Sequence, residues 1–251
     1  MISKDDRRPS AAGEPLAAGG GGGFRNNRVV EKMNLRDTVQ DGDKTHRADT
    51  SCLIPPHGGY RRLKSFQMAA LASNGMMNTT GHYWGNHDIL HRPLFALFCS
   101  VRCPGRLVLK AYDLAQKWRA EGQPVISGFH SPVEKEVLKM LLRSTVPVCV
   151  VLARGLPTRI PTEYRRPLDE GRLLLLSPFD ARTKRATQTS AAHRNRVVAS
   201  LAERIFVAYA APGSKTEAFC RELAGTGNPC LTFDDPKTDN LKRVGFIPLA
   251  V

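Results

Sequence analysis

From residue 94 onward, short apolar runs alternate with longer amphipathic stretches, and this alternation constrains the fold more than any other feature of the chain. It is the pattern of βα repeats, in which strands buried on both faces of a parallel sheet are separated by helices that cover it. We therefore predict an α/β, Rossmann-like fold with a mostly parallel sheet flanked by helices. The predicted strands are 94–99, 124–127, 147–153, 172–176, 205–209, 229–233 and 246–249. The predicted helices are 106–120, 132–142, 191–203 and 215–224.

The N-terminal part of the chain has a different composition. Residues 1–58 mix charged residues with Gly, Ser, Pro and Asn, include a glycine run at 19–23, and lack a periodic apolar pattern. We predict that they form a disordered N-terminal region. Residues 59–87 are predicted as a short helix and a linker, because apolar residues recur there at helical spacing, at Leu63, Phe66, Ala69 and Ala70. The predicted α/β domain then spans 88–251.

Charge and hydropathy limit the classes of partner. The chain has 37 Lys and Arg residues against 23 Asp and Glu, a formal net charge of +14, and residues 91–251 alone carry 25 basic and 14 acidic residues. A basic domain favours polyanionic partners, because binding releases their condensed counterions. The longest apolar run, 146–153, is too short to cross a bilayer, and the N-terminus lacks the apolar stretch of a secretory signal. We expect a cytoplasmic protein without a membrane partner.

The six cysteines follow no disulfide framework and no pattern of paired metal ligands, so reduced thiols and no metal site are expected. No cofactor is predicted either.

The loops after the predicted strands share one chemistry. In an open parallel sheet, ligands bind beyond the carboxyl ends of the strands, where the chain enters the next helix. Arginine suits phosphate there because its guanidinium group forms paired hydrogen bonds, and helix N-termini add free amides. The candidate phosphate-binding or nucleic-acid-binding residues are Ser100, Arg102, Ser127, Gly128, Arg194, Asn195, Arg196, Gly213, Ser214, Lys215 and Thr216.

Two of these loops carry a Ser-x-x-Glu capping box, at 131–134 and 214–217. Either the boxes only cap their helices, or the helix-start amides also face one anion, with Gly128 and Gly213 letting the backbone approach it. For Phe129, core packing and base stacking both stay open. Segment 158–166 interleaves basic and aromatic residues, which suits a surface that tracks a nucleic-acid backbone as well as it suits a solvated loop.

The triplet 194–196, Arg-Asn-Arg, is predicted near a helix start, where cations oppose the helix macrodipole. That local conflict favours a functional reason for the two arginines.

Taken in order, the loops resemble the Rossmann-like core of the DNA-processing protein A (DprA, also called Smf) family, over residues 94–249. Segment 100–102 (SVR) stands at the place of that family's Gly-Ser-Arg, and 127–134 (SGFHSPVE) at its Ser-Gly-x-Ala-x-Gly-Ile-Asp loop. Segment 191–196 (AAHRNR) stands at its Phe-Pro-x-Arg-Asn-Arg, so that Ala191 replaces a phenylalanine ring that could stack on a base. Segment 213–216 (GSKT) stands at the last turn of the family's pattern.

This resemblance implies a single-stranded DNA-binding protein without catalysis, associated with DNA processing, DNA uptake (transformation) and recombination. Arg102, Arg194 and Arg196 would hold phosphates, and a recombinase and a second copy of the chain would be protein partners.

Two further resemblances leave alternatives open. The same core is similar to the lysine-decarboxylase-like phosphoribohydrolases, which implies a nucleotide-binding or nucleoside-monophosphate-cleaving enzyme whose catalytic carboxylate comes from Glu134 or Glu217. Residues 58–69 resemble the opening of a four-helix-bundle family related to ribosomal intervening-sequence proteins, which again implies a helix there.

Overall fold

Strands and helices alternate along the part of the chain that the computed structural model describes, which is the backbone of residues 64–72 and 75–250 and the side chains of 81–250. The predicted disordered region, 1–58, lies outside these residues. The strands are β1 (Lys64–Ala72), β2 (Gly75–Gly85), β3 (Phe95–Cys99), β4 (Val125–Ser127), β5 (Val148–Val151), β6 (Leu173–Ser177), β7 (Arg204–Tyr209), β8 (Cys230–Phe233) and β9 (Ile247–Leu249). The α-helices are α1 (Gly105–Glu121), α2 (Pro132–Leu142), α3 (Thr162–Asp169), α4 (Gln188–Leu201), α5 (Lys215–Ala224) and α6 (Asp239–Arg243).

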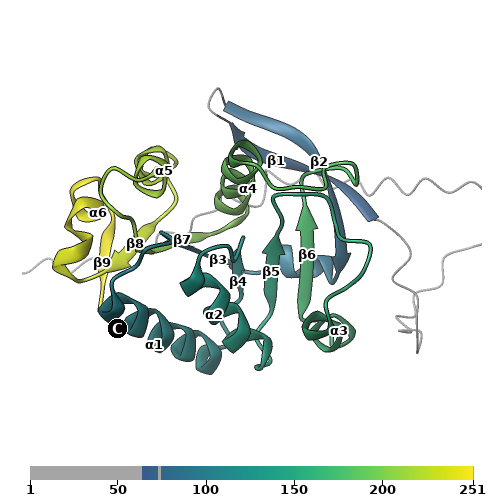
Figure 1. The fold of residues 1–251 in the computed structure, drawn as a ribbon, viewed down its shortest axis with the longest axis horizontal. Helices are drawn as coiled ribbons and strands as arrows, with labels where there is room; N and C mark the ends of the chain where they lie inside the picture. Colours follow the sequence, from purple (N-terminus) through teal and green to yellow (C-terminus); the bar gives the residue numbers. More distant parts are fainter. Residues whose placement is uncertain (1–63, 73–74, 251) are drawn as a thin grey trace, which may run out of the picture. The chain divides into compact units, whose positions relative to one another are not determined.

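All nine strands belong to one sheet, in the order β1-β2-β6-β5-β4-β3-β7-β8-β9 (Figure 1). The seven strands from β6 to β9 pair in parallel, while β2 joins the edge of β6 in antiparallel orientation. The predicted α/β, Rossmann-like sheet is confirmed. Among the described residues, no helix is both long and apolar enough to cross a membrane.

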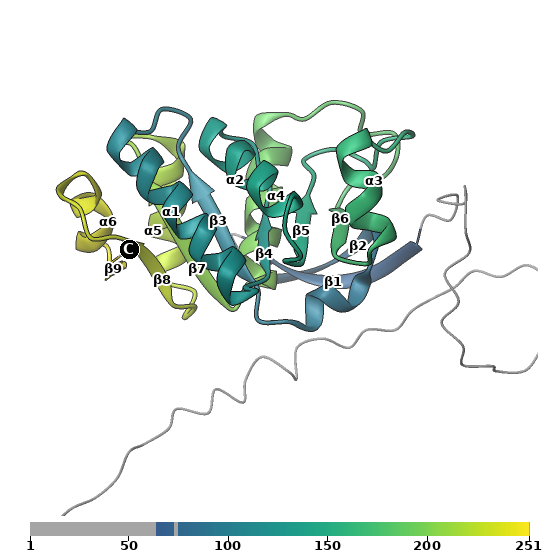
Figure 2. The ribbon, with the colours of Figure 1, turned by 90° about the horizontal axis from the view of Figure 1, so that it is seen from below.

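The two faces of the sheet are covered by different helices, and each helix buries an apolar stripe against its face. Helices α1, α2 and α3 pack on one face around Leu97 and Val148, and Figure 2 looks onto this layer. Helices α4, α5 and α6 pack on the other face around Ala96 and Val151. The central strands are apolar on both sides because both sides are covered.

The predicted helix between 59 and 87 is wrong. Residues 64–72 form β1, which pairs antiparallel with β2 in a register that runs from Lys64 opposite Tyr83 to Ala72 opposite Gly75. Phe66, Met68 and Ala70 also recur at every second residue, which is the strand period, so this short segment fits the helix and the strand period equally. Pairing with the adjacent strand β2 makes it a strand. Because β2 continues onto β6, the hairpin extends the sheet and the domain begins before the predicted boundary at 88.

Two other segments differ from the prediction. Part of segment 158–166 is helical, because α3 begins at Thr162 directly after Pro161. Helix α4 begins at Gln188, three residues earlier than predicted, with the Thr187 side chain capping it. Arg194 and Arg196 therefore lie more than one turn inside α4, and the argument from the macrodipole at a helix start does not apply to them.

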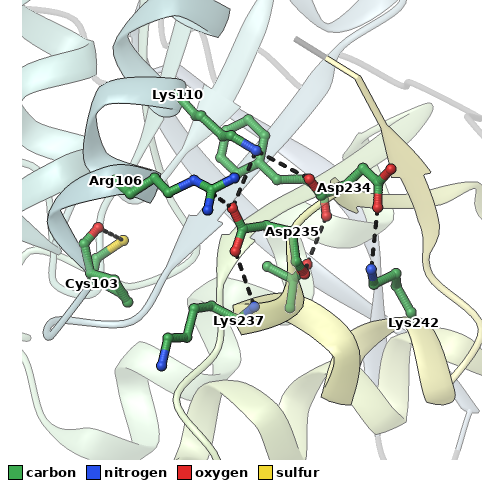
Figure 3. Close-up of polar contacts among 10 residues, drawn as sticks. Cys103, Arg106, Lys110, Asp234, Asp235, Lys237 and Lys242 are labelled. Carbon is green, nitrogen blue, oxygen red and sulfur yellow. Dashed lines mark hydrogen bonds and ion pairs between the residues drawn. The ribbon is translucent and has the colours of Figure 1, made fainter.

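An ionic cluster fixes the start of α1 beside the end of β8 (Figure 3). The Asp235 carboxylate contacts Arg106 Nε at 3.1 Å and Lys110 Nζ at 3.3 Å, and it accepts the Lys237 amide at 3.0 Å. The Asp235 side chain is only 1% exposed, whereas that of Arg106 is 70% exposed. The Lys237 amide, together with Lys110 and Arg106, lowers the pKa of Asp235 despite its burial.

We expect Asp235→Asn to lower the free energy of unfolding by about 1 kcal/mol at pH 7, because charge-assisted hydrogen bonds become neutral ones. Since the folded pKa of Asp235 is depressed, its contribution is present above the unfolded value of about 3.9 and is lost as the pH falls through the folded value. Urea unfolding of both proteins at pH 7 and near pH 3 checks this. A difference that persists unchanged in acid would contradict it.

Candidate phosphate-binding site

A pocket of about 140 Å³ opens beyond the carboxyl ends of β3 and β4 and the start of α5. Strands β3 and β7 are neighbours in the sheet but not consecutive, since the chain first runs outward through β4, β5 and β6 and then returns. Helix α1 leaves β3 on one face and α5 leaves β7 on the other. This is the topological switch point, where open α/β sheets place their ligand crevice.

Arg194 is the buried cation of this pocket. The residue is 5% exposed, and its Nε donates to Asn195 Oδ1 at 2.8 Å while Nη1 donates to the Val151 carbonyl at 3.4 Å. Nη2 makes no hydrogen bond to any residue that the structure describes. Burial lowers the pKa of Arg194, while the charge of Glu134 raises it. A guanidinium group held this way is oriented before any ligand arrives.

The Arg194 guanidinium group packs directly against Gly128. A Cβ built on Gly128 would meet Arg194 Nη1 at 1.7 Å and Cζ at 2.0 Å. The glycine therefore makes room for a side chain from α4, whereas the sequence suggested that it lets a ligand approach the backbone.

Glu134 lines the pocket and connects β3, the loop after β4 and α2 through hydrogen bonds. Its Oε1 accepts the Cys99 amide at 2.8 Å, and its Oε2 accepts the His130 amide at 2.7 Å and the Ser131 amide at 3.2 Å. Burial raises the pKa of Glu134, against the lowering effects of these amides and of Arg194. The capping box of α2 is confirmed, and two of the amides that an anion would use are already bound by the protein's own carboxylate.

In the loop before α5 the predicted capping box is only half formed, because the Glu217 carboxylate accepts the amide of Gly213 and not that of Ser214. Gly213, at φ +72°, donates its amide to Glu217 Oε2 at 2.9 Å, and Ser214 Oγ accepts the Glu217 amide at 3.2 Å. Of the four candidates in this loop, only Thr216 lines the pocket, and Lys215 bonds to Gln188 on α4.

The candidate serines hold strand ends in place. Ser100 Oγ accepts the Ala211 amide at 3.1 Å, which joins the ends of β3 and β7. Ser127 Oγ donates to the Leu97 carbonyl at 2.7 Å and accepts the Phe129 amide at 3.1 Å. Both side chains are buried, so they shape the site without lining it.

The predicted arginines do not all converge. Arg102 is exposed and follows Val101, which lines the pocket, but Arg102 itself does not line it. Arg196 points to α5, where it forms a two-pronged ion pair with Glu222 at 3.0 and 3.2 Å. The structure brings together Gly128, Arg194, Asn195 and Thr216.

Sequence reasoning named His130, which lines the pocket, as a residue that could stack or hydrogen-bond with a ligand, but it missed the ring pair Phe98 and Phe219, whose centroids lie 5.2 Å apart. The phenylalanines come from a strand and a helix far apart in the sequence, so only the fold joins them. Phe129 packs in the core and adopts φ +46°, a left-handed conformation that non-glycine residues rarely take. Its strained backbone lies directly beside Gly128 in the pocket loop.

The hydrolase alternative gains no support from this geometry. Both Glu134 oxygens accept backbone amides, and Glu217 binds the Gly213 amide, the Asn240 side chain and Arg221. Neither carboxylate stands ready to act on a ribose, which glycosidic cleavage requires.

Comparison with known proteins agrees with the fold. No curated protein sequence matches the chain. DprA from Streptococcus pneumoniae superposes with a TM-score of 0.57 at 20% identity, over 68% of this chain and 63% of that chain, so the chain spans less than two thirds of this relative. DprA from Helicobacter pylori, described with its single-stranded DNA binding mode, gives a TM-score of 0.54 at 18% identity, over 66% of this chain and 77% of that chain. The family model of the DNA recombination-mediator protein A matches residues 79–219, more than half of the chain, which therefore belongs to this family.

Proposed function

We propose that this protein binds single-stranded DNA during DNA processing in uptake and recombination, with one backbone phosphate held by Arg194. The observation that carries the proposal is a buried guanidinium group, seated on Gly128, that lines a pocket at the switch point of a basic α/β domain. The relative from Helicobacter pylori is described as binding single-stranded DNA, which supports the same ligand for this chain.

The pocket is too small to enclose a whole nucleotide. Pockets that enclose small-molecule ligands usually measure about 300 to 1,000 Å³, whereas this one measures about 140 Å³. It has room for a phosphate group, so the rest of the ligand has to lie outside this pocket. The exposed cation Arg102, in the loop after β3, suits a further phosphate of a longer chain.

The test is a titration of a labelled oligonucleotide at several salt concentrations. For single strands, log K falls with log salt by about 0.7 per phosphate contacted. We expect a slope that corresponds to at least three phosphates and far weaker binding of a mononucleotide. Equal affinity for a mononucleotide, or release of ribose phosphate from it, would contradict the proposal and favour the hydrolase.

Arg102→Ala is expected to weaken oligonucleotide binding severalfold and to reduce the salt slope by about 0.7, because one phosphate contact is lost. The melting temperature should not change, since Arg102 is exposed and makes no hydrogen bond or ion pair within the described residues. Arg143→Ala is the matched control, because Arg143 is also exposed but lies at the opposite end of α2 from the pocket. Equal effects of the two variants would exclude a specific role for Arg102.

A recombinase partner, a homodimer and a cytoplasmic location stay predictions that derive from the sequence.

A further inference from the structure

A second and larger hollow lies next to the phosphate pocket. It is a groove of about 370 Å³ between the first turns of α1 and α2, and we call it the α1–α2 groove. Its lining is mostly apolar and includes Val108, Tyr112 and Val133. Lys135 and Lys139 lie at the same groove and are exposed.

The groove and the phosphate pocket are neighbours, because Val101 lines both of them. This valine is 62% exposed, and among the described residues it is one of only three large hydrophobic side chains with such exposure. An exposed apolar side chain between two hollows suits a ligand that passes from one to the other.

The chemistry of the groove matches a nucleotide. Bases stack on aromatic rings and pack on apolar side chains, while lysines track the backbone. Glu136 also lines the groove, but its carboxylate pairs with Lys139 Nζ at 2.6 Å, so Lys135 leaves the rim positive. At about 370 Å³, the groove is also within the size range of ligand pockets, which the phosphate pocket is not.

We propose that the α1–α2 groove is a base-binding subsite for single-stranded DNA. It takes the base of a nucleotide adjacent to the one whose phosphate contacts Arg194, with Tyr112 as the stacking ring and Lys135 beside the backbone. The inference rests on the proposed function, and it adds the direction in which the strand leaves the phosphate pocket, over Val101 and between α1 and α2.

The test compares Tyr112→Leu, which removes the ring but keeps an apolar side chain, with Tyr112→Phe, which keeps the ring. Stacking one base contributes about 5- to 150-fold in affinity, so Tyr112→Leu should weaken binding of an oligothymidylate by that factor, while Tyr112→Phe should bind like wild type. An oligothymidylate carrying 5-iododeoxyuridine should cross-link to Tyr112 on irradiation. Lys135→Gln should lower the salt slope by about 0.7, and Lys117→Gln, at the other end of α1, should not.

The outcomes separate the two proposals. If Tyr112→Leu and Lys135→Gln bind like wild type while Gly128→Ala, which displaces the Arg194 guanidinium group, weakens binding, the subsite is excluded and the proposed function stands. If all of these variants bind like wild type, the phosphate site fails as well. Should Tyr112→Leu fail to fold, Lys135→Gln and the position of the cross-link decide the question.

Discussion

Gly128→Ala is expected to weaken oligonucleotide binding by about tenfold to a hundredfold, although it removes no charge. The added methyl group would occupy the space of the Arg194 guanidinium, with 1.7 Å to Nη1, so this group has to leave its seat. A misplaced guanidinium loses charge-assisted hydrogen bonds of about 1.5 to 3 kcal/mol each. Gly128 does not have a left-handed φ, so alanine fits the backbone there.

Fluorescence titration of the oligonucleotide measures this effect, and circular dichroism checks that the variant is folded. Gly105→Ala is the matched control, because a Cβ at Gly105, the first residue of α1, would meet no atom within 4 Å. Wild-type affinity of Gly128→Ala would show that the seat of Arg194 does not matter for binding.

Glu134→Ala is expected to lower the free energy of unfolding by roughly 3 to 5 kcal/mol, the largest loss of stability among the changes considered. It would leave the amides of Cys99, His130 and Ser131 without their acceptor, and it would leave Arg194 buried without a nearby opposite charge. Each orphaned buried donor costs about 1 to 3 kcal/mol.

Chemical denaturation measures the difference, with Glu136→Ala as its control on the same helix. Glu136 is exposed and, among the residues that the structure describes, pairs with Lys139 alone, and exposed pairs contribute at most about 1 kcal/mol. A loss for Glu134→Ala no larger than that for Glu136→Ala would mean that the hydrogen bonds of the Glu134 carboxylate, which connect β3 to α2, contribute little to the free energy of unfolding.

The sequence predicts the parallel part of the fold well, because buried strands and amphipathic helices have different apolar periods. The bounds of α2 and α5 were predicted to the residue, since Ser131 with Pro132 and Ser214 mark where these helices begin. The hairpin could not be distinguished from a helix, because a nine-residue segment with small apolar residues fits both periods. The segment 64–72 is a strand because it pairs with β2, which in turn pairs with β6.

The candidate site was predicted in its location but not in its contacts. The rule that ligands bind at the carboxyl ends of parallel strands correctly selected the loops that carry Gly128 and Thr216. Sequence spacing could not show that Gly128 supports Arg194, 66 positions further along the chain, or that Arg196 turns to Glu222 on α5. Such contacts depend on the packing of α4 against the sheet.

The β1–β2 hairpin also covers the edge of β6. Through β2 it occupies the backbone donors and acceptors along the outer side of β6, whose four central leucines are all buried. In a chain that begins at residue 88, this leucine-rich strand would be an unpaired edge strand. Such a strand can pair with a strand of another molecule and start aggregation. By pairing with β6, strand β2 removes this edge, and a chain without β2 is expected to aggregate more readily.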